Sequence, residues 1–180
     1  LLTQKEVLDL EPNLQPVFDA GVIYESAMHA RDPHGILKKI FKLFLERGGK
    51  FIQTNIKSLK QININETVIK SESKEYKFEK TVVASGAFSK SLTDQLGEKI
   101  PLDTERGYHV HFKAKDHLLQ RPVIFLDRGF GMTPMNQGLR AVGTVELGGL
   151  KNPPSQKRID YIIKCAKELL PQLGKHEDEW

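Results

Sequence analysis

The chain has 180 residues, of which 39% are hydrophobic and 28% are charged, and its formal net charge is +4. This composition supplies enough apolar material for a core and excludes wholesale disorder. The basic residues are scattered and have no cluster of aromatic residues beside them, so the charge favours an ordinary solvated surface over a nucleic-acid-binding one.

A capping-box pattern opens the chain. Thr3 followed by Glu6 predicts a short helix over residues 3–9, which the Glu11-Pro12 dipeptide ends. Short strands are then predicted at residues 17–18 and 21–24, around a turn at Asp19-Ala20.

A longer helix is predicted from Asp32-Pro33, with aspartate at the N-cap and proline at the first helical position. Gly48-Gly49 stands where the C-cap of this helix is expected. Between them, apolar residues recur at the helical spacing of about 3.6 residues, at Ile36, Leu37, Ile40, Phe41, Phe44 and Leu45.

A meander of short strands is predicted after this helix. Its segments are Phe51-Ile52, Ile56, residues 59–64, residues 67–69 and residues 76–78, with a turn at Asn65-Glu66. Residues 80–84 form a short β-branched apolar run that predicts a buried strand. That run ends in the small-residue turn Ser85-Gly86-Ala87, and a short helix through Leu92 and Leu96 follows.

The pattern changes at Pro101 to antiparallel strands with short connections. They are predicted at residues 108–112, 123–125, 131–134 and 139–147, with a turn at Asn136-Gln137-Gly138. An amphipathic helix at residues 156–170 ends at Pro171. The sequence therefore predicts a mixed α/β lobe near residues 30–97 and an antiparallel lobe from about 100 to 155.

A single cysteine and the lack of long apolar runs indicate where the protein works. Cys165 has no partner for an intramolecular disulfide, which favours a reducing, cytoplasmic location. It stands in the apolar periodicity of a helix, so we interpret it as a packed core thiol. No run reaches the roughly 20 apolar residues of a bilayer span. We therefore expect no transmembrane segment, while peripheral association with a membrane stays open.

The turn after residues 80–84 is the first candidate binding site. Small residues at the end of a strand let backbone approach a ligand closely, and ligands of open α/β sheets bind beyond the carboxyl ends of strands. Ala84, Ser85 and Gly86 are therefore candidates for contacting a flat cofactor. From these residues alone, a plain tight turn is the better interpretation.

Polar residues around Tyr108 form the second candidate site. Arg106 suits a carboxylate through its two-pronged guanidinium, and His109 or His111 could move protons near neutral pH. The two histidines have the i, i+2 spacing of a metal pair on a strand. No suitably placed carboxylate or cysteine accompanies them, so we expect no metal. From these residues alone, a surface or cross-strand structural role for either histidine is the better interpretation.

Two weaker candidates complete the survey. Glycines concentrate between Gly129 and Gly149, which indicates backbone packed closely against another group. Within this stretch Glu146 stands at a strand end, where a solvated edge residue is a better interpretation than a base. His29 and Arg31 precede the helix cap and are interpreted as loop residues.

Taken together, these segments resemble the family of FAD-dependent D-amino acid dehydrogenases and related glycine/D-amino acid oxidases. The resemblance rests on the order and spacing of motifs along nearly the whole chain. They are Leu10-Glu11-Pro12, His29-Ala30-Arg31-Asp32-Pro33, Gly48-Gly49-Lys50-Phe51, Thr81-Val82-Val83-Ala84-Ser85-Gly86-Ala87-Phe88-Ser89, Ile100-Pro101-Leu102, Glu105-Arg106-Gly107-Tyr108-His109, Arg121-Pro122-Val123, Met132-Thr133-Pro134-Met135 and Gly143-Thr144-Val145-Glu146-Leu147-Gly148-Gly149-Leu150.

The resemblance implies an α+β fold, a fragment of the FAD-dependent oxidoreductase (DAO-like) fold. The reaction would oxidise the C–N bond of an amine or amino acid by hydride transfer to flavin N5, giving an imine that water hydrolyses. By the same resemblance, FAD contacts would fall at Ile56, Ala84, Ser85 and Gly86, and substrate-facing side chains at Tyr108, His109 and Thr133.

The sequence departs from the family pattern at two places. The Gly-x-Gly-x-x-Gly turn that holds the pyrophosphate is missing, and so is the Gly-x-Arg-Pro stretch. We therefore expect an interior piece of a parent protein that binds FAD weakly or not at all by itself. Residues 1–28 would lead into the substrate lobe, 29–97 would form the middle of the FAD-binding lobe, and 98–180 the substrate-binding lobe with its C-terminal helix.

Three functions compete at this stage. They are a piece of a D-amino acid dehydrogenase-like enzyme, a non-catalytic remnant or binding module, and a sarcosine or glycine oxidase-like enzyme. The partner of either enzyme would be a small amine or amino acid and not a nucleic acid. The sequence leaves open the amine, the electron acceptor (oxygen or a quinone) and the oligomeric state.

Overall fold

The computed structural model describes residues 1–113 and 118–177, which form two compact units. Unit 1 comprises residues 1–40, 106–146 and 153–180, less the residues outside the described ranges, and unit 2 comprises residues 41–105 and 147–152. Each unit thus joins segments that are far apart in the sequence. In the described ranges, no helix combines the length and hydropathy needed to cross a bilayer.

The first helix of unit 1 begins with the predicted capping box. α1 (Gln4–Leu10) has Thr3 as its N-cap. The Thr3 hydroxyl accepts a hydrogen bond from the Glu6 amide at 3.4 Å, and the Glu6 carboxylate accepts one from the Thr3 amide at 2.8 Å. These bonds with Thr3 lower the pKa of the Glu6 carboxyl. The prediction of this helix from local sequence is confirmed.

The strands predicted at residues 17–18 and 21–24 differ from what the structure shows. β2 (Ala20–Gly21) is the strand of this segment, and it pairs antiparallel with β1 (Leu2–Thr3). The predicted turn at Asp19-Ala20 therefore lies partly in a strand. The local pattern was misleading because the pairing partner is the distant start of the chain, not a neighbouring segment.

An antiparallel sheet forms the centre of unit 1. In the described residues its strand order is β10 (His176–Glu177), β6 (Arg106–Phe112), β9 (Gly138–Glu146), β8 (Phe130–Met135) and β7 (Val123–Phe125). Strands β6 to β9 confirm the predicted segments to within two residues, because their alternation and the turn between β8 and β9 are local signals. The short β10 was not predicted.

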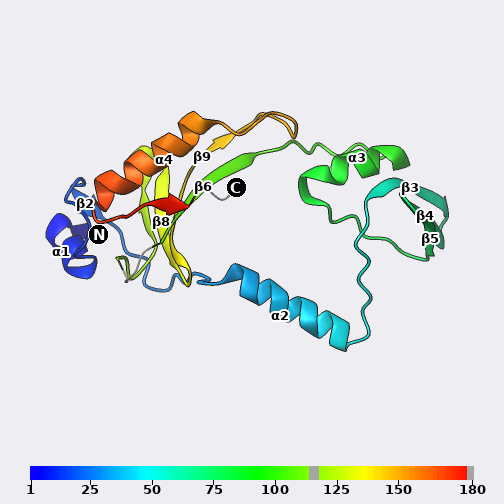
Figure 1. The fold of residues 1–180 in the computed structure, drawn as a ribbon, viewed down its shortest axis with the longest axis horizontal. Helices are drawn as coiled ribbons and strands as arrows, with labels where there is room; N and C mark the ends of the chain where they lie inside the picture. The colour runs from blue at the N-terminus through cyan, green and yellow to red at the C-terminus, as the bar shows by residue number, and fades with distance from the viewer. Residues whose placement is uncertain (114–117, 178–180) are drawn as a thin grey trace. The chain divides into compact units, whose positions relative to one another are not determined.

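One helix covers a face of this sheet and completes the core (Figure 1). α4 (Gln156–Leu169) packs on β6, β8 and β9. Cys165 is buried as a free thiol in this core, which confirms its predicted role. The buried side chains include Tyr108, Val110, Phe112, Phe130, Met132, Leu139 and Ala141 of the sheet and Ile159, Ile162, Ala166 and Leu169 of the helix.

The helix at residues 33–46 begins and ends as predicted. Asp32 Oδ1 accepts a hydrogen bond from the Gly35 amide at 2.8 Å at the start of α2 (Pro33–Glu46). At the other end Gly48 has a φ of +86°, its amide donates to the Leu45 carbonyl at 3.0 Å, and the next amide bonds five residues back at 2.9 Å. This cap requires a left-handed residue, which glycine supplies at little cost.

The apolar side of α2 is exposed. The helix contains no buried residue. A helix with a continuous apolar side ordinarily buries that side against another element. The following side chains are between 39% and 63% exposed: Ile36, Leu37, Ile40, Phe41, Leu43, Phe44 and Leu45. Together they form a surface suited to packing against another apolar surface.

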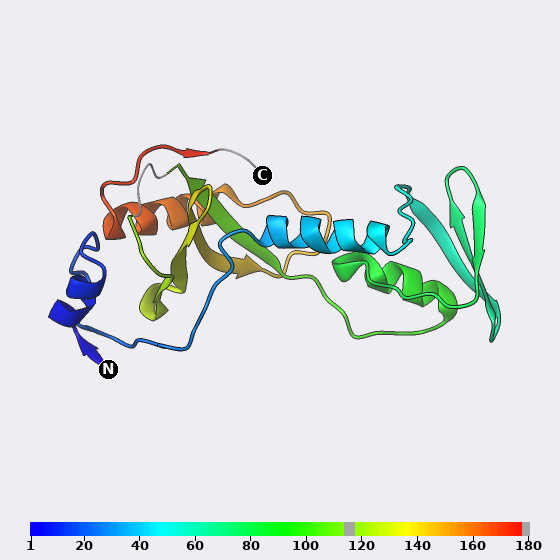
Figure 2. The same cartoon turned by 90° about the horizontal axis from the view of Figure 1, so that it is seen from below.

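The predicted meander forms the sheet of unit 2 (Figure 2). β3 (Ile56–Asn63), β4 (Glu66–Ser71) and β5 (Glu75–Phe78) pair antiparallel in that order, and Phe51-Ile52 lies outside them. Gln95 Oε1 accepts a hydrogen bond from the Leu59 amide at 3.0 Å, which ties the helical segment to β3. That segment consists of η1 (Gly86–Phe88), α3 (Ser89–Thr93) and η2 (Asp94–Leu96).

The buried strand predicted at residues 80–84 was wrong. This described stretch has no strand pairing, and Val82 is 87% exposed. A β-branched run forms a strand only when a neighbouring strand supplies its hydrogen bonds. Because none of the described strands pairs with this run, it forms no regular secondary structure.

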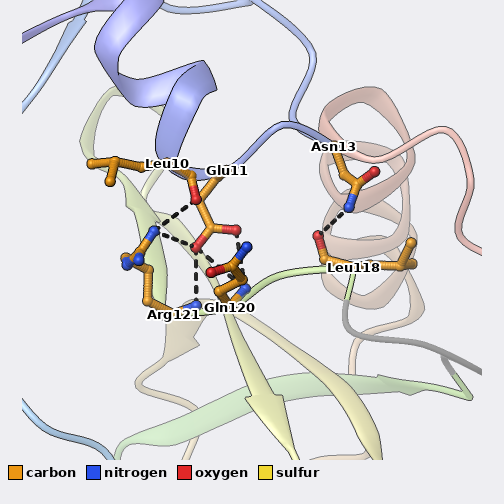
Figure 3. A network of polar contacts seen from close by, with 6 residues as sticks. All are labelled: Leu10, Glu11, Asn13, Leu118, Gln120 and Arg121. Carbon is orange, nitrogen blue, oxygen red and sulfur yellow. Dashed lines mark hydrogen bonds and ion pairs between the residues drawn. The ribbon is translucent and has the colours of Figure 1, made fainter.

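A buried carboxylate joins the end of α1 to the segment before β7 (Figure 3). Glu11 is 3% exposed, and its carboxylate accepts hydrogen bonds from the amides of Gln120 and Arg121, each at 3.0 Å. The Arg121 guanidinium donates to the same carboxylate at 3.1 Å and to the Leu10 carbonyl at 2.8 Å. One side chain thereby fixes two segments that are 109 positions apart in the sequence.

Glu11→Ala is expected to lower the free energy of unfolding by about 2 kcal/mol, because two amides and a guanidinium lose their shared acceptor. The matched control, Glu25→Ala, removes an exposed carboxylate and should change it by less than about 0.5 kcal/mol. Urea denaturation followed by circular dichroism measures both variants. Equal stability of the two variants would contradict a structural role for the Glu11 carboxylate.

Candidate functional site

Alternation along β6 sends its side chains to two faces of the sheet in unit 1. Tyr108, Val110 and Phe112 are each at most 5% exposed and belong to the core under α4. Successive side chains of a strand point to opposite faces, so His109 and His111 project from the other face. The two histidine ring centroids lie 5.5 Å apart in an edge-to-face arrangement.

The pairing register adds polar residues from two more strands to that second face. Arg140 of β9 pairs with His111 on one side and with Thr133 of β8 on the other. The residues before and after Arg140 are buried in the core, so Arg140 projects on the histidine side. We call His109, His111, Thr133 and Arg140 the polar face. It brings together His109 and Thr133, two of the residues predicted to face a substrate.

Arg140 is the member of the polar face that the sequence reasoning did not single out. Its Nε atom is buried and has no hydrogen-bond partner among the described residues. A signal for it existed in the turn at residues 136–138, because a short hairpin turn fixes the register of its strands. That register places Thr133 opposite Arg140.

The charge of Arg140 is one of three causes that lower the pKa of the His109 imidazole. Burial lowers the pKa of His109 most, and the positive charge of Arg140 and then His111 lower it further. His109 is therefore neutral at pH 7 and able to accept a proton. In residues 1–113 and 118–177, no group of three or more His, Cys, Asp or Glu side chains is placed to hold a metal ion.

Tyr108 lies on the opposite, core face of the sheet. Its hydroxyl donates to Glu146 Oε2 at 2.5 Å and accepts a hydrogen bond from the Ser155 amide at 2.8 Å. The Arg106 guanidinium lies 3.5 Å from the same Oε2. Tyr108 therefore joins the end of β9 to the start of α4. The interpretation of Glu146 as a solvated edge residue was wrong, because its carboxylate is largely buried in this cluster.

The loop before α2 is attached to β8. His29 Nε2 lies 3.1 Å from the Pro134 carbonyl oxygen, and the Asn136 amide donates to the Arg31 carbonyl at 3.0 Å. The loop assignment of His29 and Arg31 is therefore correct, and these bonds hold that loop against the sheet. A cavity of about 360 Å³ lies beside it, lined by Arg31, Leu119, Gln120 and Pro134.

The residues predicted to contact a cofactor lie in unit 2. Ile56 is the first residue of β3, pairs with Ser71 and is 40% exposed. The exposed Ser85 amide donates to Ser89 Oγ at 3.1 Å. Gly86 has a φ of +54°, and a Cβ atom built on it would meet nothing within 4 Å. Ala84, Ser85 and Gly86 thus form an exposed turn with open space beside its backbone.

Comparison with known proteins gives consistent matches along the chain. Residues 1–180 match the family model described as DAO, FAD dependent oxidoreductase. A D-amino-acid oxidase of Bradyrhizobium diazoefficiens is 33% identical over 97% of this chain and 41% of its own length. A D-amino acid dehydrogenase of Vibrio atlanticus is 27% identical over 94% and 42%. The crystal structure of glycine oxidase from Geobacillus kaustophilus superposes with a TM-score of 0.82 at 20% identity, over 94% and 46%.

The imidazole of His109 is expected to titrate below pH 6.5, and Arg140→Gln to raise its pKa by removing one cause of the depression. Because folding disfavours the protonated form, its contribution to stability is complete above about pH 6.5 and is lost as the pH falls through the depressed pKa. Histidine NMR titration measures both effects.

The control for this titration is Arg47→Gln, which removes the same charge from an exposed position. It should leave the His109 titration unchanged. A His109 pKa at or above 6.5 in the unsubstituted chain would contradict the assigned surroundings of this imidazole.

Proposed function

This chain belongs to the DAO family of FAD-dependent oxidoreductases, and we propose that it is part of an enzyme that oxidises the C–N bond of an amino acid. The predicted fold class, an α+β fragment of the DAO-like fold, is confirmed. The match of the family model to residues 1–180 carries the proposal, and the relatives' names indicate D-amino acids as substrates. The chain spans less than half the length of these curated relatives, so the activity is proposed for the parent protein.

Unit 2 supplies the residues that would hold FAD. The turn at residues 84–86 offers small side chains, a left-handed glycine and open space beside the backbone, which fits close approach of a flat group. Ile56 adds an exposed apolar side chain at the start of β3. When bound, FAD supplies the electron acceptor for oxidation of the C–N bond. The residues of this chain would bind and orient it.

The polar face of unit 1 would face the substrate. His109 and Thr133 project from it, and the neutral imidazole of His109 can accept a proton. Tyr108 enters the proposal as a positioning residue, because its hydroxyl is engaged by Glu146 and Ser155 on the core side. It would act by holding β6 and β9 in register.

A second candidate function is a module that cannot hold FAD by itself. The exposed apolar side of α2 and the unpaired run at residues 80–84 favour it, because both leave apolar groups in water. If FAD bound to unit 2 alone, these apolar groups would still be exposed to water. The two candidates differ in whether the parent protein turns over a substrate.

Gly86→Ala is expected to weaken FAD binding by the parent protein about tenfold, because a Cβ atom would enter the space beside the turn. Gly97→Ala is the matched control, since Gly97 also has a positive φ, +79°, and open space around it. Both variants carry the same backbone strain, and only the first should lose flavin affinity. Quenching of FAD fluorescence measures the binding, and equal loss in both variants would contradict a flavin contact at Gly86.

The parent protein is expected to purify yellow and to oxidise D-amino acids, with glycine and sarcosine as the comparison substrates in the same panel. The 180-residue chain alone should bind FAD more weakly than the parent does, as equilibrium dialysis would show. A colourless parent that turns over none of these amines would favour the binding module instead. Faster turnover of glycine or sarcosine than of D-amino acids would indicate a sarcosine or glycine oxidase-like enzyme.

A further inference from the structure

The hydroxyl of Tyr108 holds together the two ends of the loop between β9 and α4. This loop, residues 147–154, begins after Glu146 and ends before Ser155, the N-cap of α4. The hydroxyl donates to Glu146 Oε2 at 2.5 Å and accepts a hydrogen bond from the Ser155 amide at 2.8 Å. One buried phenol thus bonds the residues on both sides of the loop, as in compact surface loops whose ends lie close together.

The same hydrogen bonds stand where the chain leaves unit 1. Unit 1 consists of three segments and unit 2 of two, so the chain crosses between them four times. Arg106 begins the second segment of unit 1, Glu146 ends it, and Pro153 begins the third, two residues before Ser155. The Arg106 guanidinium lies 3.5 Å from Glu146 Oε2. Bonds that centre on Tyr108 and Glu146 therefore hold three of the four connections at their unit 1 ends.

The loop has little packing of its own to order it. Leu147 is 78% exposed, Leu150 is 48% exposed, and Gly149 has a φ of +69°. Loops with few buried apolar contacts open at a low cost in free energy. The hydrogen bonds at its two ends are therefore the main restraint on residues 147–154.

We propose that the bonds of Tyr108 with Glu146 and Ser155, which we call the loop clamp, position the connections between the units so that the enzyme can turn over its substrate. This step rests on the proposed function, in which unit 2 holds FAD and unit 1 faces the substrate. The reacting groups must be held at a productive distance, and a misplacement of about 1 Å can cost about a hundredfold in rate. Tyr108 acts from the core face of the sheet and is a positioning residue.

Tyr108→Phe removes the hydroxyl and keeps the buried ring. The Ser155 amide loses its acceptor, so it and the amides of residues 147–154 should exchange with solvent about tenfold faster. The matched control is Tyr161→Phe, which removes a hydroxyl of α4 that donates to the Arg128 carbonyl at 2.9 Å. It should leave these amides unchanged. Hydrogen–deuterium exchange followed by NMR on the 180-residue chain measures both variants, and equal exchange of the loop in the two would overturn the clamp.

Substitutions of Glu146 test whether the carboxylate and the hydroxyl act as a pair. Glu146→Gln keeps an oxygen acceptor for the hydroxyl, so the exchange of residues 147–154 should stay within about threefold of the unsubstituted rate. Glu146→Ala should reproduce the effect of Tyr108→Phe. The double variant should exchange no faster than either single variant, because both remove the same bond. Additive effects of the two substitutions would overturn the pairing.

Kinetics of the parent protein test the positioning role. Tyr108→Phe should lower kcat for D-alanine about tenfold per bound flavin, with KM and the affinity for FAD changed by less than about twofold. A merely structural role would lower the flavin content and leave kcat per bound flavin unchanged, which would overturn the positioning role. Tyr161→Phe should keep the unsubstituted kcat. If the unsubstituted parent oxidises no amino acid, the proposed function fails, and the exchange measurement still decides whether the loop clamp exists.

Discussion

The two-residue period of β6 and β9 is the constraint on which the rest of unit 1 depends. It places Tyr108, Val110 and Phe112 under α4 and leaves His109 and Arg140 on the other side. A slip of one residue would bury a guanidinium in the core and expose apolar groups, which costs far more than the few kcal/mol that hold a domain together. The same register therefore buries the apolar side chains in the core and places the polar face on the other side of the sheet.

A bulge in β9 extends this arrangement to Glu146. The register shifts between Gly107 and Tyr108, and Thr144 is the extra residue, with a φ of +61° that a β-branched side chain rarely adopts. Its buried hydroxyl has no hydrogen-bond partner among the described residues. Without this register shift, Thr144 would pair with Gly107 and Val145 with Arg106. With it, the Glu146 carboxylate reaches Tyr108, so the strain of about 1–3 kcal/mol is offset by a buried hydrogen-bonded cluster.

The features that could be predicted from the sequence are those that neighbouring residues in the chain determine. The capping box of α1 and the glycine cap of α2 follow from residues within one turn of each helix, and both were placed correctly. The strand predicted at residues 80–84 failed because a strand exists only through its neighbours. Arg140 was missed for a related reason. The role of Arg140 depends on which residues of β6 and β8 pair with it. The pairing register determines those residues, and the local sequence around Arg140 does not.

The two units differ in what keeps them folded. The buried hydrophobic cluster of the described chain draws all its members from unit 1, whereas Leu59 is the buried hydrophobic residue of unit 2. A sheet of three short strands with so little buried apolar area gains too little free energy to offset the conformational entropy of its own ordering. A surface or ligand that binds its folded form would stabilise it by mass action. If the turn at residues 84–86 holds FAD, cofactor binding and folding of unit 2 are then the same equilibrium, and the affinity for FAD is reduced by the cost of ordering this unit.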